Sequence, residues 1–143
     1  HRDLHSFPTR RSSDLITRSI PDDDVVVMGD RVRIEQVMIN LLRNALDATE
    51  ANKNAEVDII LAAGETASLT VRDNGVGLED IENLFEPFYT TKEPGEGVGL
   101  GLAISSGIVN DLGGRLTARN AAAGGAVFEM QLPILSQSSA AAE

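Results

Sequence analysis

The most regular pattern of apolar positions in the chain lies between Asp30 and Glu50. Apolar residues recur there every three or four positions, at Ile34, Val37, Met38, Leu41, Leu42 and Ala45. This spacing places them on one face of an α-helix. Asp30 directly precedes the pattern, and its short acidic side chain can accept hydrogen bonds from the free N–H groups of a first helical turn. The pattern predicts an amphipathic helix over residues 30–50.

Shorter patterns predict strands and further helices. Two pairs of alternating segments surround glycine-containing turns and are expected to form hairpins: 57–63 with 67–72 around Gly64-Glu65, and 115–120 with 126–132 around Gly124-Gly125. Residues 25–28 form a short apolar run suited to a buried strand. An apolar-faced helix is expected over residues 100–112, ended by Gly113-Gly114, and a short helix over residues 80–84.

Together these elements predict an α+β fold in a chain of single-domain length. The expected architecture is a two-layer sandwich of a mixed, mostly antiparallel sheet with helices on one face. The net charge of −10 argues against a nucleic-acid binder, and the aromatic content of 3% argues against a base-stacking platform. The chain has no cysteine, which excludes disulfides and thiolate metal sites. Its apolar runs all fall short of the ~18 residues that a membrane span needs.

Asn40 and Asn44 stand four residues apart on the predicted long helix, at the edge of its apolar stripe. Two neutral amides present carbonyl oxygens without adding charge, which suits a Mg²⁺ ion that is already bound to phosphates. The alternative is that both are polar boundary residues whose amides hydrogen-bond to neighbouring backbone. The pair alone does not decide between these interpretations.

The segment Asp73-Asn74-Gly75-Val76-Gly77 follows an apolar strand. A half-buried aspartate at a strand end can accept a hydrogen bond from an exocyclic amine such as adenine N6. The two glycines allow the backbone to approach a flat ring closely. A simple turn stabilised by the aspartate side chain is the alternative.

Two segments before the last helix complete the candidate chemistry. Residues 84–92, Leu-Phe-Glu-Pro-Phe-Tyr-Thr-Thr-Lys, combine aromatic anchors with Lys92, which suits a lid that brings a cation to a phosphate. An ordinary loop anchored by Phe85 and Phe88 is the alternative. Residues 95–102, Gly-Glu-Gly-Val-Gly-Leu-Gly-Leu, present successive N–H groups at a helix start, where anions bind. Their spacing fits neither the Rossmann fingerprint nor the Walker A loop.

The order of these four motifs resembles the N, G1, F and G2 boxes of sensor histidine kinases, over residues 21–133. The resemblance implies the ATP-binding sandwich that gyrase, Hsp90, MutL and histidine kinases share. Three segments are similar to sensors of the nitrogen-regulatory and C4-dicarboxylate-transport type: Asn-Leu-Leu-Arg-Asn-Ala-Leu-Asp-Ala, Thr-Thr-Lys and Ile-Val-Asn-Asp-Leu-Gly-Gly.

The resemblance also implies roles for single residues. Asn44 is expected to ligate Mg²⁺ with support from Asn40, Asp73 to bind the adenine amine, and Lys92 to act on the γ-phosphate of ATP. Gly75 and Gly77 are expected to shape the adenine pocket. The phosphates are expected to be wrapped by Gly97, Val98, Gly99, Leu100 and Gly101.

Two positions depart from the pattern of the family. Asp47 belongs to the implied nucleotide site, but it stands where some relatives carry a lysine that faces the phosphates. Positive charge must then come from elsewhere, and Lys92 is the obvious source. Ala126 stands where many relatives place a threonine that helps to bind the base, so that hydroxyl contact is absent.

The resemblance implies a protein-histidine kinase that donates the γ-phosphate of ATP to a histidine on a separate dimerisation domain. A response regulator is the implied further partner, and the parent protein is expected to be a homodimer. The fragment is expected to be a cytoplasmic domain without direct membrane contact, whether or not the parent is anchored in the inner membrane. The alternatives are an ATP-hydrolysing domain of gyrase or MutL type and a non-catalytic nucleotide-binding module.

The ends of the chain are expected to lie outside this domain. Residues 1–15, HRDLHSFPTRRSSDL, resemble a translated sequencing-library adapter, whose nucleotide string reads codon by codon as these residues. They are therefore interpreted as a disordered artefact, with an arginine-rich targeting peptide as the alternative. The ATP-binding catalytic domain is expected over residues 16–135, and the Ser/Ala-rich residues 136–143 are expected to be a disordered tail.

Overall fold

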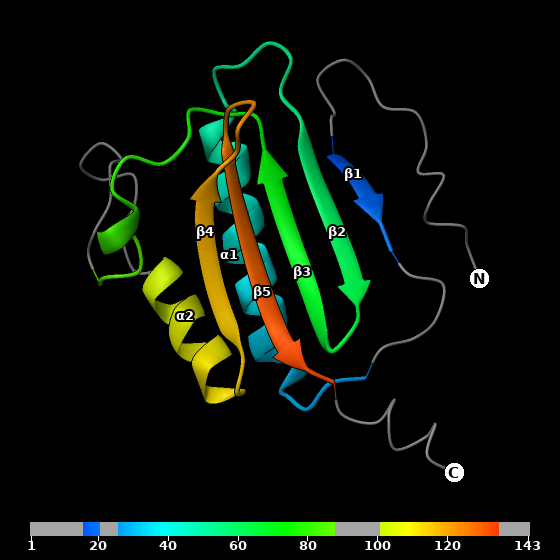
Figure 1. Cartoon of the computed structure of the whole chain (residues 1–143). Coiled ribbons are helices and arrows are strands. Elements are labelled where there is room, and N and C mark those ends of the chain that lie inside the picture. Colours follow the sequence, from blue (N-terminus) through cyan, green and yellow to red (C-terminus); the bar gives the residue numbers. More distant parts are fainter. Residues whose placement is uncertain (1–15, 21–25, 88–100, 135–143) are drawn as a thin grey trace.

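The computed structural model describes residues 16–20, 26–87 and 101–134. Their strands form one five-stranded sheet in the order β1-β2-β3-β5-β4 (Figure 1). The strands are β1 Ile16–Ser19, β2 Val57–Ala63, β3 Thr66–Asp73, β4 Arg115–Asn120 and β5 Ala126–Pro133. β1 is parallel to β2, and every other neighbouring pair is antiparallel. The mixed, mostly antiparallel sheet is as predicted.

Helices α1 (Arg31–Ala48) and α2 (Gly101–Asp111) lie together on one face of this sheet (Figure 1). α1 packs against β3, while α2 packs against β4 and β5. The apolar stripe of α1 is directed into the core through Val37, Leu41 and Ala45, each at most 2% exposed. The α+β two-layer sandwich predicted from the sequence is confirmed.

Local signals set the ends of the helices. Asp30 caps α1, because its side chain accepts a hydrogen bond from the N–H of Val32 at 2.9 Å. α2 ends where Gly113 adopts φ +82° and the N–H of Gly114 donates to the carbonyl of Val109 at 2.9 Å. The expected short helix is one 3₁₀ turn, η1 (Ile81–Asn83).

Both predicted hairpins are present. β2 and β3 are joined at Gly64 and Glu65, and their register pairs Ala63 with Ala67. β4 and β5 are joined through Gly124 and Gly125, which have φ values of +110° and +90°. Residues with side chains rarely adopt such values, so the glycine pair suits this turn.

The strand predicted over residues 25–28 is wrong. Among the described residues of that run, Val27 forms one isolated bridge with Ile134, and no ladder continues from it. Val26 and Met28 are 46% and 64% exposed, so only the middle residue is directed to the core. Conversely, the sequence patterns did not predict β1, which is a four-residue edge strand paired with β2.

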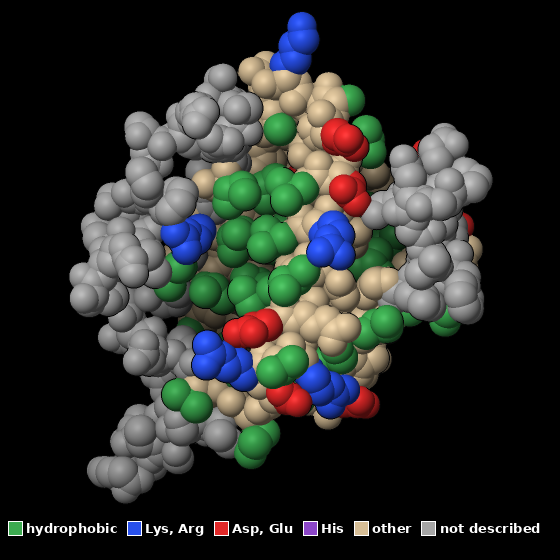
Figure 2. Space-filling view, turned by 180° about the vertical axis from the view of Figure 1, so that it is seen from behind, with side chains coloured by type: hydrophobic (Ala, Val, Ile, Leu, Met, Phe, Trp, Pro, Cys, Tyr) green, Lys and Arg blue, Asp and Glu red, His purple; other side chains and the backbone are tan. Residues whose placement is uncertain are grey.

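The helix side of the molecule carries a group of exposed apolar side chains (Figure 2). Those of α1 include Val32, Ile39 and Leu46, which are 70%, 52% and 48% exposed. They recur every seven residues and therefore lie along one outer face of the helix. Within the described part of the chain, no helix is both long and apolar enough to cross a membrane.

Candidate nucleotide-binding site

Asp73 is the last residue of β3, and only 4% of it is exposed. The strand alternates, so Leu69, Val71 and Asp73 all point toward the helix layer. Asp73 Oδ1 accepts hydrogen bonds from the N–H of Gly75 at 2.8 Å and from the N–H of Ala126 at 3.3 Å. The hydrogen bonds described for this carboxylate therefore fall on one of its two oxygens.

Burial raises the pKa of Asp73 above its ordinary value, because an ionised carboxylate loses its hydration inside the protein. The hydrogen bonds from Gly75 and Ala126 act in the opposite direction and only partly offset burial. A carboxylate kept at an energetically unfavourable position is typical of a functional site.

The glycines after Asp73 allow close backbone contacts. A Cβ at Gly75 would overlap the backbone of Ala48 at the end of α1, and the N–H of Val76 donates to the Ala48 carbonyl at 3.2 Å. Gly77 has φ +83°, and a Cβ there would lie 3.1 Å from Asn120 Oδ1. Both predicted pocket glycines are thus positions that a larger residue would disturb.

Asn40 links the two helices. Its Nδ2 donates to the carbonyl of Gly101 at 3.1 Å and to Ser105 Oγ at 3.0 Å, and Ser105 is fully buried. Part of the boundary-residue interpretation of Asn40 is therefore confirmed, since its amide nitrogen binds neighbouring groups. Its Oδ1 remains as the side-chain acceptor, next to the start of α2.

Asn44 and Asp47 continue the same helix. Asn44 is half-buried, and Asp47 is exposed. No cluster of three or more His, Cys, Asp or Glu that could hold a metal exists among the described residues. A Mg²⁺ ion here would depend on amide oxygens and on the phosphates of its ligand, which is a donor set that suits a hard cation.

Several predicted site residues lie outside the described residues: Lys92, Gly97, Val98, Gly99 and Leu100. The same holds for Phe88, one of the two expected aromatic anchors. The other anchor, Phe85, is half-buried and packs against the hydrophobic core. Gly101, the last residue of the glycine-rich segment, begins α2 and faces Asn40.

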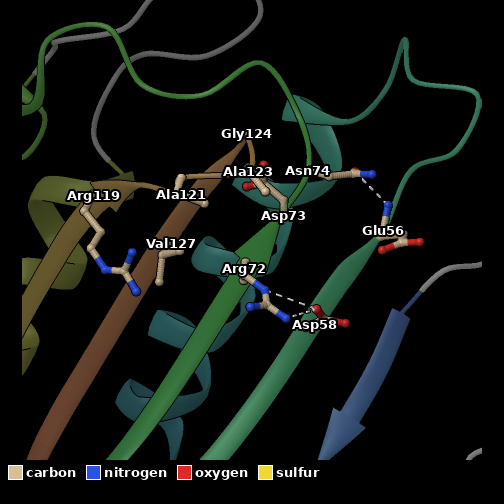
Figure 3. A pocket seen from close by; sticks show the side chains of 11 residues that line it. Glu56, Asp58, Arg72, Asp73, Asn74, Arg119, Ala121, Ala123, Gly124 and Val127 are labelled. Atoms are coloured by element: carbon tan, nitrogen blue, oxygen red, sulfur yellow. Dashed lines mark hydrogen bonds and ion pairs between the residues drawn. The ribbon is translucent and has the colours of Figure 1, made fainter.

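At the same end of the sheet, the open face holds a hollow of about 500 Å³ (Figure 3). Asp58, Arg72, Val127 and Arg119 line it from four adjacent strands. Arg72 is paired with Asp58, with a distance of 2.7 Å from Nη2 to Oδ2. Asp73 also lines this hollow, although the alternation of β3 directs its side chain to the helix side of the sheet.

Two asparagines fix the segment after β3, and neither was predicted from the sequence to do so. Asn74 Oδ1 accepts from the N–H of Glu56 at 2.8 Å, and its Nδ2 donates to the carbonyl of Asn54 at 2.9 Å. Asn120, at the end of β4, binds the backbone of Leu78. The backbone groups that these asparagines bind lie 18 to 42 positions away in the sequence. An asparagine next to a turn gives no signal for such contacts.

A two-layer sandwich with a buried aspartate at a strand end, facing a helix that carries paired asparagines, defines a candidate ATP-binding domain. Comparison with known proteins agrees. The family described as "Histidine kinase-, DNA gyrase B-, and HSP90-like ATPase" matches residues 29–136. The chain belongs to this family.

Curated relatives narrow the class to sensor kinases. The chain is 44% identical to the sensor protein FixL of Bradyrhizobium diazoefficiens, over 76% of the chain and 22% of that protein. It is 45% identical to the C4-dicarboxylate transport sensor protein DctB of Rhizobium meliloti, over 78% of the chain and 18% of that protein. The chain thus spans about a fifth of the length of these relatives. The similarity to DctB agrees with the expected subfamily.

Solved structures give the same answer. The catalytic domain of histidine kinase ThkA superposes with a TM-score of 0.72 at 32% identity, covering 83% of this chain and 79% of that one. Full-length ShkA in complex with AMPPNP matches with a TM-score of 0.71 at 26% identity, covering 84% of this chain and 25% of that one. The chain is an ATP-binding catalytic domain of the sensor histidine kinase type.

Proposed function

We propose that this domain binds ATP with Mg²⁺ at the Asp73 end of the sheet and donates the γ-phosphate to a histidine on a separate helical dimerisation domain. The buried Asp73 carboxylate carries the proposal. Its Oδ1 already accepts two backbone hydrogen bonds. Its Oδ2 is left to accept one from the exocyclic N6 amine of adenine.

The asparagines of α1 are the proposed metal residues. Asn44 would ligate Mg²⁺ through its amide oxygen, and Asn40 would support it from the preceding turn. Because Asn40 Nδ2 is bound to Gly101 and Ser105, its Oδ1 is the side-chain atom available to a cation or to an ordered water. When bound, Mg²⁺ neutralises charge on the phosphate oxygens.

The remaining roles follow from the family pattern. Residues 97–101 would bind the phosphates through backbone N–H groups, and Lys92 would bring a cation to the γ-phosphate. Asp47 would lie near the phosphates without contributing positive charge, which makes Lys92 more important. The domain would then act by positioning ATP and stabilising charge, as expected for phosphoryl transfer.

Hydrolysis of ATP by this domain is the less favoured function. Activation of water calls for a general base such as a carboxylate. The corresponding position holds Asn40, whose amide cannot accept a proton and whose nitrogen is already bound to neighbours.

We further propose that the parent protein is a homodimer and that a response regulator receives the phosphoryl group.

Incubation with γ-labelled ATP tests the transfer step. The two histidines of the chain are His1 and His5, both in the adapter-like segment, so the chain alone is expected to remain unlabelled. Addition of the helical domain of the same parent should give labelled histidine on that domain. Labelling should be weak, because the tether that raises the effective concentration is missing.

Two controls make the labelling result specific. Asn44→Ala should reduce labelling of the helical domain, and removal of residues 1–15 should leave it unchanged. Stable labelling of the chain itself, abolished by the loss of His1 and His5, would contradict both the separate acceptor and the adapter interpretation. Release of inorganic phosphate without any labelled histidine would favour the hydrolytic alternative.

A further inference from the structure

Asn120 fastens the segment after β3 to the tip of the β4–β5 hairpin. Its Oδ1 accepts a hydrogen bond from the N–H of Leu78 at 2.7 Å, and its Nδ2 donates to the carbonyl of Leu78 at 3.1 Å. One side chain thus binds both polar backbone groups of a residue that precedes it by 42 positions. Two such bonds fix the orientation of the Leu78 peptide groups as well as their distance.

The backbone before Leu78 is shaped to fit this side chain. Gly77 adopts φ +83°, and a Cβ at Gly77 would lie 3.1 Å from Asn120 Oδ1, which is closer than most such contacts. Leu78 itself packs against the hydrophobic core. The hydrogen bonds of Asn120 therefore hold a segment whose conformation and packing are already restricted.

The same hairpin tip also contacts the start of the segment. The N–H of Ala126 donates to Asp73 Oδ1 at 3.3 Å. A Cβ at Gly125 would overlap the backbone carbonyl of Asp73, so the two backbones are in direct contact. The hairpin tip thus binds the segment at its beginning, through Asp73, and at its end, through Leu78.

The middle of the segment is held by a different element. Gly75 and Val76 rest on Ala48 at the end of α1. Because α1 also carries Asn40 and Asn44, the segment connects the proposed metal residues to the proposed adenine contact. Its far end is attached to the sheet through Asn120.

We propose that Asn120 is a positioning residue for the adenine half of the nucleotide site. By fixing Leu78, it holds Gly75 and Gly77 at the distance from Asp73 that a flat ring requires, without touching the ligand. The inference rests on the proposed function, since it assumes that adenine binds at Asp73. It predicts that loss of Asn120 weakens binding of the base and leaves phosphate binding unchanged.

The test compares Asn120→Ala with Asn83→Ala in the full chain. Asn83 is a matched control, because its Nδ2 binds Asp80 within the same connection and does not attach it to the sheet. Calorimetric titrations with adenosine, and with inorganic triphosphate in the presence of Mg²⁺, separate the two halves of the site. Hydrogen exchange at the Leu78 amide reports on the attachment itself, with or without a ligand.

Asn120→Ala should bind adenosine about fivefold more weakly, the size expected for modest hydrogen bonds, with unchanged affinity for triphosphate and faster exchange at Leu78. Asn83→Ala should match the unmutated chain in all three measurements. Unchanged exchange at Leu78, or faster exchange with unchanged adenosine affinity, would overturn the inference. Equal losses for adenosine and triphosphate would also overturn it, since they indicate general damage. If the unmutated chain binds neither adenosine nor ATP, the proposed function fails, while the exchange measurement still reports on Asn120.

Discussion

Replacement of Asp73 by asparagine should separate ligand binding from stability. The amide has the same shape, so its Oδ1 can still accept from the N–H groups of Gly75 and Ala126. Its other atom becomes an N–H donor, which would face the N6 amine of adenine, another donor. The lost bond joins a neutral donor to a charged acceptor, a type worth about 1.5–3 kcal/mol. Asp73→Asn should therefore weaken ATP binding by about 10- to 150-fold.

The effect on folding should have the opposite sign. Burial raises the pKa of Asp73, so the folded chain retains this proton at pH values where the unfolded chain has released it. The contribution of Asp73 to the free energy of unfolding therefore falls as pH rises from the unfolded pKa to the raised folded pKa, and it stays low above that interval. Asparagine does not titrate. Asp73→Asn should then be at least as stable as the parent at neutral pH, and the difference should shrink as pH falls through the interval.

Calorimetric titration with ATP and urea unfolding at several pH values measure the two effects. Asp58→Asn is the matched control, because Asp58 is paired with Arg72 on the sheet face opposite to the Asp73 side chain. That variant should bind ATP like the parent. If Asp73→Asn bound ATP as tightly as the parent, Asp73 would not be the base acceptor. If Asp73→Asn were less stable than the unmutated chain at neutral pH, the carboxylate of Asp73 would stabilise the fold.

Two further changes test the metal site and the hairpin tip. Asn44→Ala should weaken ATP binding in the presence of Mg²⁺ and leave the affinity measured in EDTA unchanged; an equal affinity for Mg²⁺ and ATP in variant and parent would remove Asn44 from the site. Gly124→Ala and Gly125→Ala should both introduce backbone strain of about 1–3 kcal/mol, because both positions have positive φ. Gly125→Ala should lose about 1–3 kcal/mol more in urea unfolding, since its Cβ would overlap the backbone of Asp73 while Gly124 faces open space; equal losses in the two variants would contradict the contact between the hairpin tip and Asp73.

Elements with strong local signals were predictable from the sequence. The apolar stripe and the Asp30 cap identify α1, and glycine pairs mark both the end of α2 and the β4–β5 turn. The run over residues 25–28 was misleading, because three or four apolar residues carry no information about pairing partners. β1 is the opposite case, a strand that forms without a strand signal in the sequence. Its short sequence Ile-Thr-Arg-Ser lacks a strand signal, and its place depends on pairing with Val57–Ala63, which lies 41 positions later in the register.

The residues of the candidate site also differ in how far the sequence predicts them. Asp73, Gly75 and Gly77 were identified because their chemistry lies within five consecutive residues. The bonds from Asn40 to Gly101 and from Asn120 to Leu78 join positions 61 and 42 residues apart. Neither residue spacing nor composition encodes such contacts, since they arise only when the helices and the hairpin pack on the sheet. The sequence therefore predicts candidate ligand contacts, but it gives no signal for the residues that hold them in place.

Competition between ATP and GTP is the most direct test of the central claim, that this domain recognises adenine through Asp73. A carboxylate accepts a hydrogen bond from the N6 amine of adenine, whereas the O6 atom of guanine is an acceptor and leaves the buried carboxylate unpaired. Leaving a buried polar group unpaired costs about 1–3 kcal/mol, so ATP should bind about 5- to 150-fold more tightly than GTP in the presence of Mg²⁺. Asp73→Asn should abolish this preference. Comparable binding of ATP and GTP by the parent chain would contradict the account.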